Sequence, residues 1–110
     1  MTGREAIVAD WIEATNSFDT ERFLAFFTAD AVLDDPGVDR FEGRERIAEY
    51  YRDYFIGYRT VTRLVSTEVD GDTAHVVVHF TGDFPGGETG GIFDIEFTGD
   101  LFSAMYPDLT

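Results

Sequence analysis

Two periods of apolar residues divide the chain into a helical first half and a stranded second half. Up to about residue 55, apolar side chains recur at helical spacing, and from residue 61 onwards β-branched residues and alternation take over. Helices and strands that are segregated in this way predict an α+β fold rather than an alternating α/β fold. The 110 residues suffice for one compact domain, and we expect residues 1–110 to form it.

The first predicted helix spans about residues 4–16. Its apolar side chains fall on one stripe, with Trp11 at the centre. Thr2 and Glu5 form the pattern of a capping box, in which each side chain bonds to the backbone of the other residue. Thr2 is therefore the predicted N-cap.

Two further helices are expected before residue 57. The second is short, is capped by Asp19 or Thr20, and carries phenylalanines up to Phe27. The third spans about residues 44–55, where isoleucine, tyrosine and phenylalanine recur at helical spacing. Gly57 is the predicted C-cap of this third helix, because glycine accepts the backbone conformation in which helices often end.

The remaining segments are predicted to be strands joined by turns. In the strand at 74–80 the even positions are apolar, which predicts that one face of it is buried. Residues 31–33 form a short strand, and residues 36–42 are expected to be loop. The other predicted elements are strands at 61–69, 91–97 and 101–106, tight turns at 70–72 and 98–100, and a glycine-rich loop at 82–91.

Composition narrows the function classes. The net charge is −14 and all eight basic residues are arginine, which opposes binding to nucleic acid or to an anionic membrane. The acidic surface suits a solubility role in a salty cytoplasm, and the absence of lysine is equally consistent with a bias of genome composition. There is no cysteine, no signal peptide pattern and no apolar run of membrane-spanning length, so we expect a soluble cytoplasmic protein.

Asp35 is the most informative single residue, because Pro36 follows it directly. The proline pushes Asp35 into an extended conformation, and a rigidly presented carboxylate beside apolar residues suits a general base. The sequence Asp-Asp-Pro-Gly is also good turn chemistry, so a purely structural turn is the alternative. Asp34 points the opposite way if the segment is extended, so only one of the two carboxylates can face a pocket.

Two other patterns give weaker evidence for a functional site. His75 and His79 are neighbours on one strand face and could bind a metal, but a third ligand at suitable spacing is missing and surface histidines are common. The glycine-rich loop lacks lysine and precedes a strand rather than a helix, which argues against a phosphate site. The expectation is no metal and no cofactor.

Four segments in order resemble the nuclear-transport-factor-2-like superfamily, in particular its SnoaL-like and ketosteroid-isomerase-like branches. The resemblance covers nearly the whole chain and lies in residues 11–19, 26–36, 41–51 and 91–97. It implies a cone-shaped fold with three N-terminal helices packed on a strongly curved antiparallel sheet and an apolar pocket at the open end. The superfamily contains isomerases, cyclases, dehydratases, epoxide hydrolases and non-catalytic binding modules, so the fold alone does not name an activity.

The resemblance also suggests site residues. Asp35 matches the carboxylate that shuttles the proton in ketosteroid isomerases. Trp11 stands where those enzymes have a hydrogen-bonding tyrosine, and it is either a pocket donor or part of the core. Tyr51 matches a supporting tyrosine, and Asp94 is nearest to a protonated aspartate of their oxyanion site, although the alternation of the strand turns Asp94 to the other face. Tyr50, Tyr51 and Tyr54 share the third helix by their spacing, and they either line a pocket or form a core stripe with hydroxyls at its rim. Tyr54 and Phe27 complete the expected substrate-binding set.

The predicted function follows from these residues together. We expect a protein that binds a small apolar ligand and, if it is an enzyme, transfers a proton next to a carbonyl with Asp35 as general base. The alternative is a non-catalytic ligand-binding or dimerisation module of the same fold. The expected partners are the ligand and a second copy of the chain in a homodimer.

Overall fold

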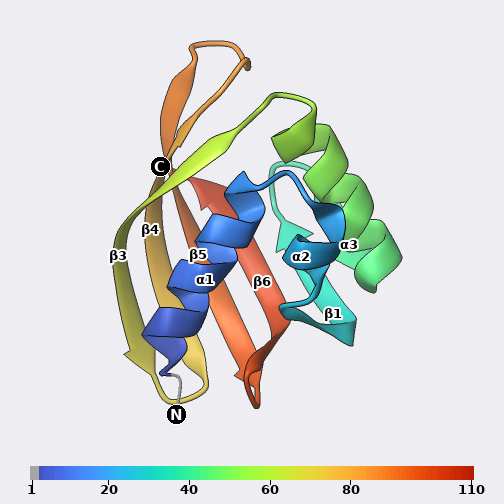
Figure 1. The fold of residues 1–110 in the computed structure, drawn as a ribbon, viewed down its shortest axis with the longest axis vertical. Helices are drawn as coiled ribbons and strands as arrows, with labels where there is room; N and C mark the ends of the chain where they lie inside the picture. Colours follow the sequence, from blue (N-terminus) through green and yellow to red (C-terminus); the bar gives the residue numbers. More distant parts are fainter. Residues whose placement is uncertain (1–2) are drawn as a thin grey trace.

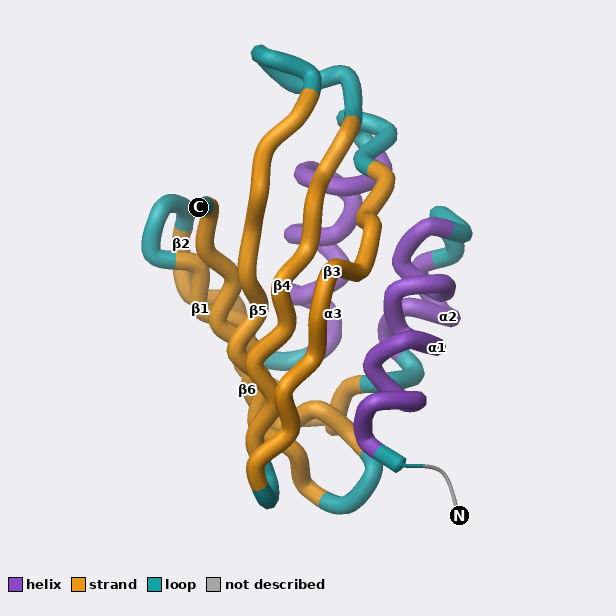
Figure 2. Tube along the Cα trace, turned by 90° about the vertical axis from the view of Figure 1, so that its left-hand side faces the viewer, coloured by secondary structure: helices purple, strands orange, loops and turns teal. Residues whose placement is uncertain are grey.

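Three helices lie on one side of a six-stranded sheet (Figure 1; Figure 2). The structure is a computed structural model, and it describes residues 3–110. The helices precede most of the strands in the chain, so the α+β class predicted from the sequence is confirmed. Within the described residues, no helix is both long enough and apolar enough to cross a membrane.

The helices begin and end close to the predicted positions. They are α1 (Arg4–Asn16), α2 (Thr20–Leu24) and α3 (Arg44–Tyr51). The side chain of Asp19 caps α2 by accepting hydrogen bonds from the backbone N–H groups of Glu21 and Arg22, as one of the two predicted caps. The predicted cap of the first helix, Thr2, lies outside the described residues.

The third helix differs from its prediction at its C-terminal end. After α3 the chain continues as a π-helical turn, η1 (Arg52–Ile56), in which the N–H of Gly57 donates to the carbonyl of Arg52 at 2.8 Å. A π turn spans one residue more than an α turn, so it changes which side chains face the sheet. Gly57 ends this turn as predicted, but with a φ of −60° and without a left-handed cap.

The sheet is mixed, which corrects the antiparallel sheet that the resemblance implied. Its strand order is β2-β1-β6-β5-β4-β3, and all neighbours are antiparallel except β1 and β6, which are parallel. Consecutive hairpins join β3, β4, β5 and β6, and α3 separates these four strands from β1 and β2 in the chain. The parallel pair of β6 and β1 therefore joins the last strand of the chain to the first. The strands are β1 (Phe27–Asp35), β2 (Asp39–Glu42), β3 (Val61–Asp70), β4 (Thr73–Thr81), β5 (Glu88–Thr98) and β6 (Leu101–Leu109).

Several strand boundaries differ from the sequence prediction, which ended the first strand at residue 33 and the last at residue 106 instead of at Asp35 and Leu109. Phe27 opens β1 instead of continuing the second helix. Residues 39–42 form β2 instead of loop, with Phe41 opposite Leu33 on β1. The glycine-rich loop ends at residue 87, because Glu88 already pairs with Thr81 on β4. In each case a neighbouring strand supplies backbone partners that a local pattern does not reveal.

The alternation along the strands places the core between the sheet and the helices. The even positions of β4 are buried, as predicted, and so is the alternating set on β5. Trp11 packs here with edge-to-face contacts, its ring centroid lying 5.0 Å from that of Phe93 and 5.6 Å from that of Phe102. The largest buried side chains of this core include Trp11, Tyr51, Phe23, Phe27, Phe93 and Phe102.

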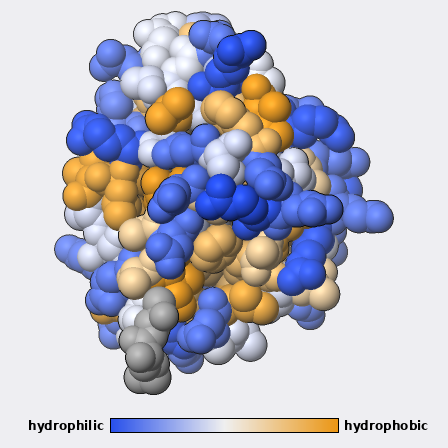
Figure 3. Space-filling model, viewed as in Figure 1, coloured by the Kyte–Doolittle hydropathy of each residue, from blue (hydrophilic) through white to orange (hydrophobic). Residues whose placement is uncertain are grey.

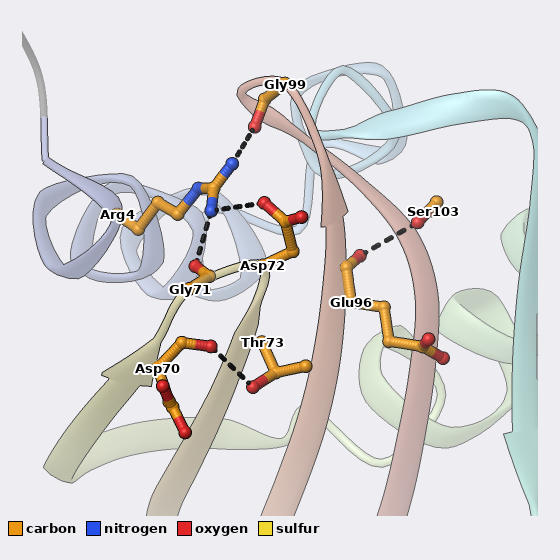
Figure 4. A network of polar contacts seen from close by, with 8 residues as sticks. All are labelled: Arg4, Asp70, Gly71, Asp72, Thr73, Glu96, Gly99 and Ser103. Carbon is orange, nitrogen blue, oxygen red and sulfur yellow. Dashed lines mark hydrogen bonds and ion pairs between the residues drawn. The ribbon is translucent and has the colours of Figure 1, made fainter.

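Arg4 fastens the start of α1 to the two turns at the far end of the sheet (Figure 4). Its guanidinium donates to the carboxylate of Asp72 at 2.9 Å and to the carbonyl of Gly99 at 3.0 Å, and also to the carbonyl of Gly71. The same group lies 4.8 Å from the ring centroid of Phe97. These contacts tie α1 to the sheet at the end of the molecule opposite to the β4–β5 hairpin, which projects at the top of Figure 1.

Candidate functional site

A pocket of about 360 Å³ opens at the end of the molecule from which the β4–β5 hairpin projects. Its walls come from the end of β1 with the following turn, the end of α3 with η1 and the segment after it, the β4–β5 hairpin with its loop at 82–87, and the end of β6. Aromatic side chains dominate the lining, and Asp35 is part of it. A volume of this size holds a small organic molecule.

Asp35 reaches the pocket because it lies on the inner face of β1. Leu33 and Asp35 are two residues apart and share that face, whereas Asp34 lines a depression on the other face. Asp34 lies 3.7 Å from Arg40 there. The prediction that only one of the two carboxylates can face a pocket is thus confirmed.

Both oxygens of the Asp35 carboxylate accept a hydrogen bond. Oδ1 accepts from the backbone N–H of Gly37 at 3.0 Å, and Oδ2 accepts from the hydroxyl of Tyr50 at 2.7 Å. The first bond is the turn chemistry expected of Asp-Asp-Pro-Gly, and the second holds the carboxylate against the pocket wall. The two readings of Asp35 from the sequence, turn residue and pocket residue, describe the same side chain.

Tyr50 lines the pocket, although the sequence analysis favoured its neighbour Tyr51 and left Tyr50 out of the expected site. Its side chain is only 5% exposed, and burial together with the negative charge of Asp35 raises the pKa of its phenol well above the ordinary value of 10.0. The phenol therefore keeps its proton and remains a donor to Asp35 at any physiological pH. The signal that could have found it is the spacing of Tyr50, Tyr54 and Tyr58, which recur every four residues.

Aromatic rings form a continuous wall beside the carboxylate. The ring centroids of Tyr50 and Tyr54 are 5.2 Å apart, and those of Tyr50 and Phe55 are 6.1 Å apart. Phe55 in turn meets Phe80 edge to face at 6.0 Å. The π turn accounts for part of this arrangement, because it allows Phe55, five residues after Tyr50, to pack against it.

The rim of the pocket is unusually apolar for exposed surface. Eight large hydrophobic side chains of the described chain are exposed, and four of them line this pocket: Val38, Tyr54, Tyr58 and Leu109. Elsewhere the surface mixes hydrophilic residues with small apolar patches, as the face in Figure 3 shows. Exposed apolar residues that gather at the mouth of a pocket mark a place where a ligand or partner would cover them.

The structure brings together only part of the predicted site. Asp35 and Tyr54 both line the pocket. Three other side chains, Trp11, Phe27 and Tyr51, have no exposed surface and belong to the closed core. They were expected at the pocket, but aromatic residues of β5 and β6 pack against this group, and all three are fully buried.

The hydroxyl and indole groups of that core do not point to a ligand. The Tyr51 hydroxyl donates to the backbone carbonyl of Thr15 at 2.7 Å. Burial raises the pKa of Tyr51 to about 12. The Nε1 of Trp11 finds no acceptor among residues 3–110, and the indole ring packs edge to face against Phe93 and Phe102.

Asp94 lies on the outer face of the sheet, as the alternation of the strand predicted. Its carboxylate is 2.6 Å from Nδ1 of His75 on β4. This placement corrects its assignment to the substrate-binding set, because the sheet separates it from the pocket. His79 lies 3.6 Å from Glu88 on the same outer face. Among the described residues, no three side chains of the histidine and carboxylate type come together as a metal would require.

The sequence of the chain matches a known protein family. Residues 8–104 match the SnoaL-like domain. The chain belongs to this family. No curated protein matches the chain.

Solved structures share the fold of this SnoaL-like domain at low sequence identity. A candidate polyketide cyclase from Sinorhizobium meliloti is 24% identical, with 93% of each chain covered and a TM-score of 0.85. A nuclear-transport-factor-2-like protein of unknown function from Cytophaga hutchinsonii is 10% identical, with 100% of this chain and 92% of the other covered and a TM-score of 0.83.

A third structure of this fold was solved with a bound molecule. It is a protein with a ketosteroid-isomerase-like fold from Catenulispora acidiphila in complex with trimethylamine, 16% identical, with 93% of this chain and 83% of the other covered and a TM-score of 0.83. Together with the family match, these structures confirm the resemblance that the sequence suggested. At such identities they establish the fold and leave the chemistry to the residues of this chain.

Proposed function

We propose that this SnoaL-like domain binds a small, largely apolar carbonyl compound and transfers a proton at the carbon next to its carbonyl group. Asp35 is the general base of this proposal, and the pocket is the open end of the cone that the resemblance implies. The observation that carries the proposal is the position of Asp35, whose carboxylate is held by two hydrogen bonds at the wall of an aromatic pocket.

The proton step uses groups that the pocket already contains. The carboxylate of Asp35 takes a proton from the carbon, the electron pair of the C–H bond moves into the carbonyl to form an enolate, and the resulting carboxylic acid returns the proton to carbon. The aromatic wall excludes water from the carbanion-like intermediate. Tyr54 lines the pocket with a hydroxyl that bonds to no other described residue, so it can donate to the carbonyl oxygen.

Tyr50 acts through Asp35 in this scheme and is a positioning residue. Its protonated phenol keeps one carboxylate oxygen in place, which fixes the direction of the other lone pairs. A base that is held in one orientation loses less entropy when it meets the substrate than a mobile side chain does.

The test is exchange of carbon-bound hydrogen for deuterium in heavy water, followed by NMR on a panel of ketones. The protein should accelerate exchange at the carbon next to the carbonyl of at least one ketone, and Asp35→Asn should lower that rate about 10²- to 10⁴-fold while the fold is kept. Asp34→Asn is the matched control, because it removes the adjacent carboxylate on the other face. Exchange that is equally fast in the parent and in Asp35→Asn would refute the proposed base.

The second candidate function is a non-catalytic ligand-binding module. Two observations favour it: the turn and Tyr50 already occupy both oxygens of Asp35, and the Catenulispora structure of this fold holds a small amine. In that case ligands bind in the pocket, but no ketone of the panel exchanges its hydrogen faster with the protein than without it.

We also propose that the outer face of the sheet pairs with a second copy of the chain. Val77 and Ile92 are opposite each other on that face and only partly buried, and Tyr106 is exposed beside them. An isologous two-fold contact would cover these side chains. Light scattering at micromolar concentration should give twice the mass of the chain, and a monomer mass would refute the pairing.

A further inference from the structure

The described residues that line the pocket carry negative charge and include no cationic side chain. Among the described residues that line it, the charged ones are aspartates, Asp35 within the pocket and Asp108 at its edge, and none is arginine or histidine. The chain as a whole carries a net charge of −14. The electrostatic potential at this site is therefore negative, and a pocket of this kind disfavours anionic ligands.

The proposed proton transfer places negative charge on the ligand. When a proton leaves carbon, negative charge develops on the carbonyl oxygen, and enzymes commonly stabilise such charge with a cationic or strongly polar group of their own. Here the hydroxyl of Tyr54 is a neutral donor, and no cationic side chain of the described chain lines the site. A positive charge on the ligand itself would supply the missing balance.

The aromatic wall is suited to one kind of positive charge in particular. Five rings besides Tyr50 line the pocket, and their packing leaves ring faces and edges along its surface. A quaternary ammonium has no N–H donor and a tertiary one has a single N–H, so the group needs at most one acceptor, and it is attracted to the faces of tyrosine and phenylalanine rings. A primary ammonium or a guanidinium would instead lose hydrogen bonds to water on entering such a site.

We infer that the ligand of this pocket carries a tertiary or quaternary alkylammonium group. The group lies against the aromatic wall formed by Tyr54, Phe55 and Phe80, and Asp35 supplies the balancing negative charge. The inference rests on the proposed function in taking this pocket as the ligand site. It adds the chemical class of the ligand, and it applies whether the pocket catalyses or only binds.

The experiment compares choline with 3,3-dimethyl-1-butanol, which has the same shape with a neutral carbon in place of nitrogen. Binding of each is followed by NMR chemical shifts of the protein at one ionic strength near 0.15 M, where charges farther away than about 8 Å are largely screened. Choline should bind at least about tenfold more tightly than the neutral alcohol, because only choline gains the attraction of the rings and of Asp35. The shifted resonances should belong to Tyr54, Phe55 and Phe80.

Three variants separate the pocket from the general charge of the chain. Asp35→Asn should remove most of the preference for choline, and Tyr54→Leu should reduce it by removing a ring. Asp34→Asn changes the net charge by the same amount as Asp35→Asn but lies on the other face, so it should leave the preference intact. The proton exchange assay on neutral ketones is independent of these measurements.

Each alternative outcome refutes the inference. Equal binding of the two probes, or no shift with either, would show that the pocket does not select an alkylammonium group. A preference that survives Asp35→Asn would show that Asp35 does not supply the balancing charge. A preference that falls equally in Asp34→Asn would show that it arises from the net charge. In all of these cases, exchange of a neutral ketone that depends on Asp35 would leave the proposed function standing.

Discussion

Tyr50 and Tyr51 are adjacent on α3, yet they belong to two different regions of the interior. Tyr51 is fully buried, stacks on Phe23 with ring centroids 4.0 Å apart, and donates to the backbone carbonyl of Thr15. Tyr50 lines the pocket and donates to Asp35. Because successive side chains of a helix point about 100° apart, one helix supplies the closed core and the pocket wall with neighbouring residues.

The comparison shows that aromatic content alone does not distinguish a core from a binding pocket. Both regions contain several phenylalanine and tyrosine rings. They differ in what the tyrosine hydroxyl meets: a backbone acceptor in the core, where the bond only stabilises, and an ionisable carboxylate in the pocket, where the bond positions a group that can react. In the core the rings are packed on all sides, whereas at the pocket some apolar side chains remain exposed.

The largest difference between the regions should follow from removing one ring in each. Phe23→Ala should lower the free energy of unfolding by about 3–5 kcal/mol, since the ring is fully buried among others. Phe84→Ala should cost about 1 kcal/mol, because Phe84 is partly exposed at the pocket. Urea denaturation of both variants measures the difference. Equal losses would mean that the pocket wall is part of the core.

Alkaline pH should destabilise both regions through their tyrosines. Burial raises the pKa of Tyr51 from 10.0 to about 12, and burial with the charge of Asp35 raises the pKa of Tyr50 further. Above pH 10 the unfolded chain releases these protons while the folded chain retains them, so stability is full below pH 10 and falls as the pH rises towards 12.

The expected fall is about 2 kcal/mol for each buried tyrosine. It is measured as the free energy of unfolding in urea at a series of pH values. Tyr51→Phe should remove the part of the fall that belongs to Tyr51, and Tyr106→Phe, at an exposed position, should leave most of the fall in place. A free energy that stays flat above pH 10 would contradict the raised pKa values.

At neutral pH, removal of the two hydroxyls should separate stability from binding. Tyr51→Phe leaves the carbonyl of Thr15 without this donor in a buried place, and should cost about 1–2 kcal/mol. Tyr50→Phe frees an oxygen of Asp35 that water can reach through the pocket, and should cost less than about 1 kcal/mol. Its effect should appear instead in the exchange rate and in choline binding, whereas Tyr51→Phe should leave both unchanged.

Salt should have the smallest effect, and it should act in opposite directions on the melting temperature and on choline binding. At a net charge of −14 the acidic side chains of the folded chain repel one another. The Debye length, over which charges act, falls from about 10 Å at 0.1 M salt to about 3 Å at 1 M. The melting temperature should therefore be higher in molar NaCl than in low salt, while choline should bind more weakly. A flat or falling melting temperature would show that the acidic surface is already well dispersed or balanced by arginine.

The periodicity of the sequence was sufficient for the helices and for most of the sheet. Local patterns of apolar residues, turn residues and the Asp19 cap act over a few residues, so they could be read directly. The alternation of β5 also placed Asp94 on the outer face before the structure did. The parallel pairing of β1 with β6 could not be predicted, because it joins segments that are distant in the sequence. Strand β2 and the π turn have local partners, but their short patterns did not distinguish them from a loop and from an α-helix.

The candidate site divides in the same way. The sequence by itself singled out Asp35, since the proline after it and the turn residues around it act locally. Only the tertiary structure decided which tyrosine holds that carboxylate, because 15 residues separate Tyr50 from Asp35 and the choice between Tyr50 and Tyr51 is a matter of helix rotation against the sheet. Packing among distant side chains likewise decided that Trp11 and Tyr51 close the core and that the space beside Asp35 stays open.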